Sequence, residues 1–191
     1  MKKKEKILNR MIYSLIIVVL ICLTGRSLYK NKEEVFIKEI SYIEPKVTII
    51  NNLVVWDGLT KEELINKLNK NLYHELSDTG KYFADFTEKT GLDPYLAVSI
   101  VNLETGCKWG CSTLVKKCNN IGGMKGVPSC NGGSYAKFNT LEEGINSYLK
   151  MLYKYYWLKG LNTPEKMNSK YAESSSWALK VNKYYENIEQ S

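Results

Sequence analysis

The stretch that most restricts how this chain can fold is residues 93–125, where a helix, a cysteine-bearing turn and a glycine-rich loop follow one another. Asp93 is a favourable N-cap, and Pro94 suits the first position of a helix. Gly106 is a favourable place for the helix to stop, because glycine often follows the last helical turn. The pattern therefore predicts a helix that begins after Asp93 and ends before Gly106.

Glu104 is a carboxylate at the end of this predicted helix. It shares a stripe with Ala97 and Val101, at i, i+4 and i+7 spacing. We expect it to lie beside small apolar side chains, where burial and the negative end of the helix dipole both favour the protonated form. A glutamate that keeps its proton near neutral pH can act as a general acid. The alternative is a solvated glutamate at a helix end.

An uncharged apolar run covers residues 11–23, and most of the nearby basic residues precede it. Of the formal net charge of +7, residues 1–10 hold +4. This distribution predicts a membrane anchor over residues 1–25, with the N-terminus in the cytoplasm and the rest of a single-pass chain outside the cell. The alternative is a signal peptide that is cleaved to give a secreted protein. Residues 26–54 are interpreted as a stalk.

Residues 55–191 are predicted to form the domain, and their pattern is mostly helical. Capping boxes open at Thr60 and Thr140, and another helix is expected over about residues 79–89. Glycines and Pro128 break up residues 119–138, which are interpreted as a loop or small hairpin. We therefore expect a mainly α fold with a small β-hairpin or loop lobe.

Composition excludes several classes of function. The charge outside residues 1–10 is spread thinly, so the sequence has no basic stripe of the kind that binds nucleic acid. His74 is the single histidine, which excludes a zinc site with several histidines. No metal and no cofactor are expected.

Four cysteines lie in the predicted exported domain: Cys107, Cys111, Cys118 and Cys130. An even set in an oxidising compartment suggests disulfides, and three pairings are possible. We favour Cys118–Cys130, which would hold the glycine-rich loop, together with Cys107–Cys111 after Glu104. The alternative is a zinc site made of all four, although their spacing matches no common zinc module.

Several motifs occur in one order along residues 55–191. They are Glu104-Thr-Gly-Cys, Asn119-Asn120-Ile121-Gly122-Gly123-Met124-Lys125-Gly126, Tyr135, Leu141-Glu142-Glu143-Gly144-Ile145, Tyr171-Ala172 and Trp177-Ala178. Together they resemble the bacterial and phage glucosaminidases of the lysozyme-like superfamily. The resemblance implies an α+β lysozyme-like fold and a peptidoglycan hydrolase, an endo-β-N-acetylglucosaminidase that cuts the β-1,4 bond after N-acetylglucosamine.

The resemblance also implies roles for individual residues. Glu104 matches the family's catalytic acid, which protonates the departing glycosidic oxygen. Tyr135 matches a tyrosine beside that acid, where it would stabilise positive charge on the sugar ring. Trp177 resembles an aromatic residue that stacks on a sugar face. The segment that lines the floor of the substrate groove is matched by Asn119, Asn120, Gly122, Gly123 and Lys125.

A second catalytic carboxylate is harder to find. Glu143 is accounted for by its capping box, Glu142 is expected to be solvated, and residues 126–137 contain no acid. Two routes need one acid only: attack by the substrate's 2-acetamido group before hydrolysis, or attack by the muramic acid 6-hydroxyl, as in a lytic transglycosylase. Another alternative is a non-catalytic wall-binding component of a secretion or conjugation apparatus.

Overall fold

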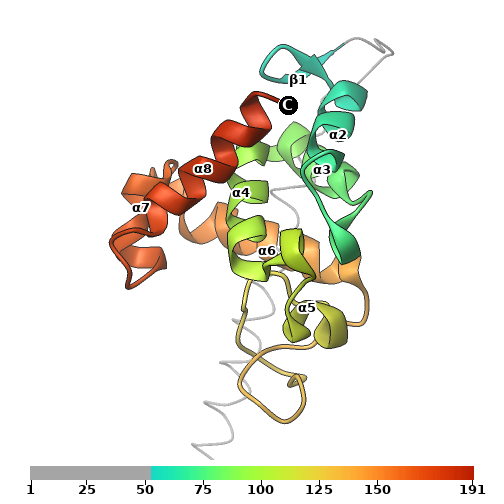
Figure 1. The fold of residues 1–191 in the computed structure, drawn as a ribbon, viewed down its shortest axis with the longest axis vertical. Helices are drawn as coiled ribbons and strands as arrows, with labels where there is room; N and C mark the ends of the chain where they lie inside the picture. The colour runs from blue at the N-terminus through green and yellow to red at the C-terminus, as the bar shows by residue number, and fades with distance from the viewer. Residues whose placement is uncertain (1–52) are drawn as a thin grey trace, which may run out of the picture. The chain divides into compact units, whose positions relative to one another are not determined.

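The computed structural model describes residues 53–191, and most of their secondary structure is helical (Figure 1). The α-helices are α2 (Lys61–Asn69), α3 (Gly80–Thr90), α4 (Pro94–Thr105), α5 (Thr113–Cys118), α6 (Leu141–Tyr155), α7 (Pro164–Tyr171) and α8 (Trp177–Glu189). Short 3-10 helices occur at η1 (His74–Leu76), η2 (Cys107–Trp109) and η3 (Trp157–Lys159). The predicted mainly α fold is confirmed.

A two-stranded antiparallel sheet precedes α2. Its strands are β1 (Val54–Trp56) and β2 (Leu59–Thr60), with Trp56 opposite Leu59. The two residues between the strands, Asp57 and Gly58, both have positive φ, as a tight hairpin turn requires.

The predicted N-caps at Thr60, Asp93 and Thr140 are confirmed, although the reciprocal half of the capping box predicted at Thr140 is absent because the Glu143 side chain accepts from Asn139 instead. Thr60 opens α2 with a reciprocal capping box in which Glu63 takes part. The side chain of Asp93 accepts hydrogen bonds from the first turn of α4, and Gly106 ends that helix in the left-handed conformation. The start and the end of α4 are therefore determined by the residues next to them, the cap Asp93 and the glycine Gly106.

Helix α4 lies at the centre of the domain and is buried on nearly all sides. Every residue from Pro94 to Asn102 is buried, so burial extends well beyond the stripe that Ala97 and Val101 share. Helix α8 runs beside it in the opposite direction (Figure 1), because the start of α8 contacts the end of α4 and the end of α8 contacts its start. The chain thus builds its core around the helix that carries Glu104.

The predicted loop lobe, residues 119–138, has little regular structure. Two isolated antiparallel bridges, Lys125 with Tyr135 and Ser129 with Ala136, give it a hairpin-like course. The lobe is hydrogen-bonded to the end of α5, since the amide of Phe138 donates to the carbonyl of Cys118 at 3.0 Å.

The predicted anchor over residues 1–25 and nearly all of the predicted stalk lie outside the described residues. Within residues 53–191, no helix combines the length and the apolar character needed to cross a membrane.

Candidate active site

Glu104 lies in the last turn of α4, one residue before that helix ends at Thr105. Its side chain is exposed, whereas Ala97 and Val101 on the same stripe are fully buried. The expectation that Glu104 is buried among apolar side chains is therefore wrong. The spacing identified the correct face of the helix, but the last turn extends beyond the core that covers the earlier turns.

One oxygen of this carboxylate is held by the protein. The indole Nε1–H of Trp177, at the first position of α8, donates to Oε1 of Glu104 across 3.0 Å. An indole N–H can only donate, so Oε1 is fixed as an acceptor. Within the described residues, no donor contacts Oε2. Glu104 thus has one anchored oxygen and one that is free to meet a ligand.

Trp177 is itself held by an aromatic stack. Its ring lies against Tyr171 with centroids 4.7 Å apart, and Tyr171 in turn meets Tyr156 at 5.2 Å. The side chain of Trp177 is 5% exposed. The predicted role of Trp177 in stacking on a sugar needs an open ring face, which this buried indole lacks. Its position instead makes it the residue that orients Glu104.

Two tyrosines, the fully buried Tyr148 and the half-buried Tyr171, are close enough to Glu104 to respond to its charge. Burial, together with the charge of Glu104 and Tyr156, raises the pKa of Tyr171. Burial is also the main cause that raises the pKa of Tyr148, and Glu104 adds to it. The Tyr148 hydroxyl donates to the carbonyl of Ala97 at 3.1 Å, which ties α6 to α4 beneath the site. Both phenols therefore remain neutral donors at physiological pH.

The proximity of these tyrosines to Glu104 is not predictable from the sequence pattern. Tyr171 belongs to one of the resembling motifs but has no role assigned from the sequence, and nothing local in the sequence relates Tyr148 or Tyr156 to Glu104. Glu104 and Trp177 are 73 residues apart, and no local spacing rule relates residues at that separation. The order of the motifs along the chain, which resembles that of the family, was the one signal that related Tyr171 and Trp177 to Glu104.

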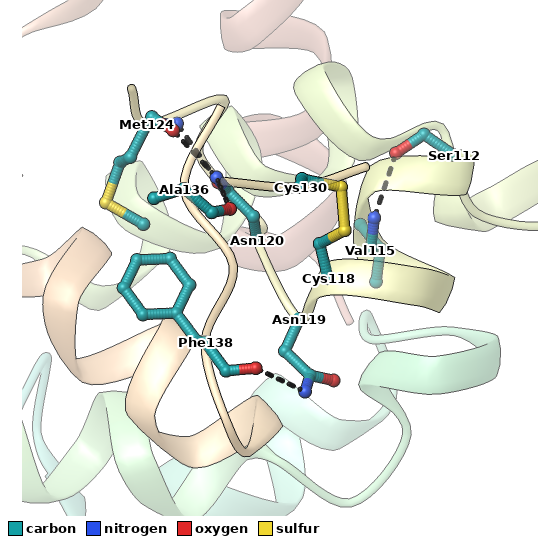
Figure 2. Close-up of a disulfide and its surroundings, with 9 residues drawn as sticks. All are labelled: Ser112, Val115, Cys118, Asn119, Asn120, Met124, Cys130, Ala136 and Phe138. Atoms are coloured by element: carbon teal, nitrogen blue, oxygen red, sulfur yellow. Dashed lines mark hydrogen bonds between the residues drawn. A yellow bond between two sulfur atoms is a disulfide. The ribbon is translucent and has the colours of Figure 1, made fainter. Parts of the chain in front are cut away.

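Asn120 organises the loop lobe from inside (Figure 2). Its side-chain amide donates to the carbonyls of Met124 and Ala136, each at 2.8 Å, while its oxygen accepts from the amide of Met124 at 3.0 Å. The side chain is 1% exposed, so it has no group left for a sugar. The predicted ligand role of Asn120 is replaced by a structural one.

Asn119 has a related role at the junction between the lobe and the helices (Figure 2). It ends α5 in the left-handed conformation, with φ of 52°, and its amide donates to the carbonyl of Phe138 at 3.0 Å. A Cβ atom at Gly144 of α6 would lie 1.8 Å from the carbonyl oxygen of Asn119. The glycine in α6 therefore permits this backbone to pack directly on the helix.

Gly122 and Gly123 differ in what they do. A Cβ at Gly122 would lie 2.6 Å from the ring of Tyr148, so glycine is needed there for packing. Gly123 is exposed and has φ of 60°, a conformation that glycine adopts at little cost. Gly123 thus leaves its backbone accessible, as the predicted groove floor requires, whereas Gly122 serves the packing of the lobe on α6.

Tyr135 and Lys125 lie opposite each other in the lobe and are both exposed, Tyr135 by 43%. In the described part of the chain the Tyr135 hydroxyl makes no hydrogen bond to Glu104. Its predicted role beside the acid, and the predicted contact of Lys125 with substrate, stay predictions.

Both favoured disulfides are present. Cys107 pairs with Cys111, and Cys118 pairs with Cys130, which ties the last residue of α5 to the lobe (Figure 2). The alternative of a four-cysteine zinc site is therefore wrong. Glu75 lies near the sulfur atoms of the first disulfide, but oxidised sulfurs do not provide the thiolates that a metal needs.

The carboxylates that follow Glu104 in the sequence have other partners. Glu142 accepts from the hydroxyl of Tyr82 at 3.2 Å, and the side chain of Glu143 accepts from the amide of Asn139 at 2.9 Å, one residue before the N-cap Thr140. Residues 105–141 contain no acidic side chain at all. The lobe therefore offers no carboxylate to work with Glu104.

A known protein family matches the part of the chain that contains these residues. The family model described as "Glucosaminidase: Mannosyl-glycoprotein endo-beta-N-acetylglucosaminidase" matches residues 80–190, more than half of the chain. The matched range contains Glu104, the tyrosine–tryptophan stack and the whole loop lobe. No curated protein matches the chain.

Proposed function

This chain belongs to the glucosaminidase family, and from that membership we propose that it is a peptidoglycan hydrolase that cuts the β-1,4 bond after N-acetylglucosamine. Membership indicates a glycoside hydrolase in general, and the proposal adds the bond and the acid. One observation carries it: the indole of Trp177 holds one oxygen of Glu104 and leaves the other open. A carboxyl group held in this way is positioned to transfer a proton to a bound substrate.

The anchored oxygen determines where the acidic proton resides. Because Nε1–H of Trp177 donates to Oε1, a proton on the same oxygen would compete with that contact. In the acid form the proton then lies on Oε2, the oxygen that has no hydrogen-bond partner within the described residues. As the glycosidic bond breaks, Oε2 gives this proton to the departing oxygen, and the resulting carboxylate keeps its hydrogen bond to the indole.

The second half of the reaction has no carboxylate from the lobe to use, since residues 105–141 contain none. We propose that the substrate's 2-acetamido oxygen attacks the anomeric carbon and that water then opens the cyclic intermediate. Glu104, now ionised, takes the proton of that water. The same observation favours a second candidate, a lytic transglycosylase in which the muramic acid 6-hydroxyl attacks and an anhydro end forms.

The proposed place of action is the outer side of the cell membrane. Two disulfides support an oxidising compartment, because such bonds rarely persist in the cytosol. The anchor over residues 1–25, or its cleavage to release a secreted protein, stays a prediction, as does membership of a secretion or conjugation apparatus. A non-catalytic wall-binding component would keep the fold without needing a free oxygen on Glu104.

The test is to incubate the full chain with purified peptidoglycan and identify the soluble fragments by mass spectrometry after borohydride reduction. Glu104→Gln should lower cleavage about 10²- to 10⁴-fold, since the amide keeps the shape and the acceptor but donates no acidic proton. Glu62→Gln is the matched control, because Glu62 is an exposed glutamate in the first turn of α2.

Fragments with reducible N-acetylglucosamine ends, made by the wild type and the Glu62 variant alone, would support the hydrolase. Anhydro-muramic ends would make the protein a transglycosylase. Full activity in the Glu104 variant, or binding without any cleavage by the wild type, would contradict the proposal.

A further inference from the structure

A groove of about 340 Å³ lies between α8 and the segment that follows Glu104. It is lined by Leu103, Lys108, Trp109, Lys180, Lys183 and Tyr184. The α8 residues of this set lie on one face of the helix, at i, i+3 and i+4 spacing. Leu103 directly precedes Glu104, so one end of the groove lies in the same helical turn as the proposed acid.

The groove is locally positive although the domain is nearly balanced. Residues 53–191 contain seventeen lysines and fifteen acidic residues, yet three lysines and no acid line the groove. In the part of the chain that the structure describes, ion pairs join Lys61 to Asp85 and Glu88, and none involves a lysine of the groove. These ammonium groups are therefore available to an anionic ligand.

The groove also has an unusually open aromatic side. Trp109 is 83% exposed, and the ammonium of Lys108 lies 5.8 Å from the centre of its ring. The disulfide between Cys107 and Cys111 spans the turn that carries this tryptophan. An indole left in water beside an apolar leucine is characteristic of a surface that a partner covers. The expected ligand therefore combines small apolar groups with more than one negative charge.

We propose that this groove binds the peptide side chains of the peptidoglycan strand through their free carboxylates while the glycan itself passes Glu104. The inference rests on the proposed function, and it names the part of the substrate that the enzyme selects. The short wall peptides present methyl groups to Trp109 and Leu103 and carboxylates to Lys180 and Lys183. The enzyme should accordingly prefer strands that still carry their peptides over strands from which an amidase has removed them.

The experiment measures binding of the full-length Glu104→Gln protein to insoluble peptidoglycan freed of phosphate-containing polymers, before and after amidase treatment. Replacing both Lys180 and Lys183 by Ala should weaken binding to peptide-bearing strands about tenfold at low salt, and the difference should shrink as salt rises. Trp109→Ala should weaken the same binding. The matched control replaces Lys89 and Lys150 by Ala, because these lysines are exposed on α3 and α6, away from the groove.

Several results would overturn the proposal: equal losses in the control variant, no loss in either groove variant, the same loss on amidase-treated strands, or a loss seen only when phosphate-containing polymers are left in place. The two proposals fail separately. If binding depends on the lysines but the wild type cuts nothing, the groove proposal stands and the hydrolase proposal is wrong. If cleavage depends on Glu104 but binding does not depend on the lysines, the hydrolase proposal stands and the groove proposal is wrong.

Discussion

The two ends of α4 each carry a carboxylate that is hydrogen-bonded to α8, but the two carboxylates differ in how many of their oxygens are occupied. At each end a carboxylate accepts a hydrogen bond from an aromatic side chain of α8. At the start of α4 the hydroxyl of Tyr185 donates to Oδ2 of Asp93 at 2.9 Å. At its end the indole of Trp177 donates to Oε1 of Glu104 at 3.0 Å.

The difference lies in the acceptors that remain. Oδ1 of Asp93 accepts from the backbone amides of Tyr95 and Leu96, at 2.8 and 3.1 Å, so both of its oxygens are occupied in a buried environment. Glu104 is exposed and has one oxygen occupied. A carboxylate with every acceptor occupied stabilises the fold, whereas one held by a single oxygen is oriented and still able to react.

Within this comparison, the largest effect on cleavage is expected at the Glu104 end of α4. Trp177→Phe removes the indole donor and keeps a ring in the stack, so cleavage by the folded protein should fall about 10- to 100-fold, the value of a hydrogen bond to a charged group. The measurement is initial rate per folded molecule, with folding followed by circular dichroism. Tyr185→Phe removes the matching donor at the other end and should leave that rate unchanged. Equal losses in the two variants would break the comparison.

The disulfides should matter at one end alone. Replacing Cys118 and Cys130 by Ser should lower the free energy of unfolding by about 3 kcal/mol, because the bond closes a loop with a separation of 12 residues. Amide hydrogen exchange should speed up in the lobe, residues 119–138, and cleavage should decrease. Exchange in the first turns of α4 should stay as in the wild type under conditions where both proteins are folded. Faster exchange there would show that the two ends are not independent.

A smaller effect is expected for stability at the start of α4. Tyr185→Phe leaves one oxygen of buried Asp93 without its donor and should cost about 1–3 kcal/mol in urea unfolding. Tyr155→Phe is the matched control, because the side chain of Tyr155 is 50% exposed and its hydroxyl has no hydrogen bond in the described residues. If the two variants are equally stable, Tyr185 does not support Asp93.

The smallest effect is a pH dependence. Burial raises the pKa of Asp93 more than its hydrogen bonds lower it. The folded state then binds more protons than the unfolded state, so this residue makes stability fall as pH rises from the ordinary aspartate range through the raised pKa. Asp93→Asn keeps the cap and cannot ionise, so its stability relative to the wild type should improve over the pH range above the ordinary aspartate pKa of about 4. A constant difference across that range would contradict this account.

Sequence reasoning succeeded where a signal is local. The cap at Asp93, the stop at Gly106, the capping box at Thr60 and both cysteine pairs follow from residues that are close in the chain. The burial of individual residues and the contacts between residues distant in the chain could not be predicted in this way. Spacing put Glu104 on the right stripe of α4, but the exposure of its last turn depends on where other elements end.

The role of Trp177 illustrates the same limit. The order of the motifs predicted that Trp177 belongs to the site. Whether its ring is open to a sugar or covered by Tyr171 depends on how α7 and α8 pack together. Asn120 was likewise placed in the lobe correctly, while its three contacts inside the lobe could not be inferred from a run of glycines.

The distance along the chain between Glu104 and its hydrogen-bond partner also sets when that hydrogen bond can form during synthesis. The donor lies 73 residues after the acid, which at roughly 5–20 residues per second corresponds to about 4–15 s of synthesis. A nascent chain that has emerged only as far as α7 contains the acid, the lobe and all four cysteines, but not the group that orients the acid. The hydrogen bond that orients Glu104 can therefore form only after the start of α8 has been synthesised.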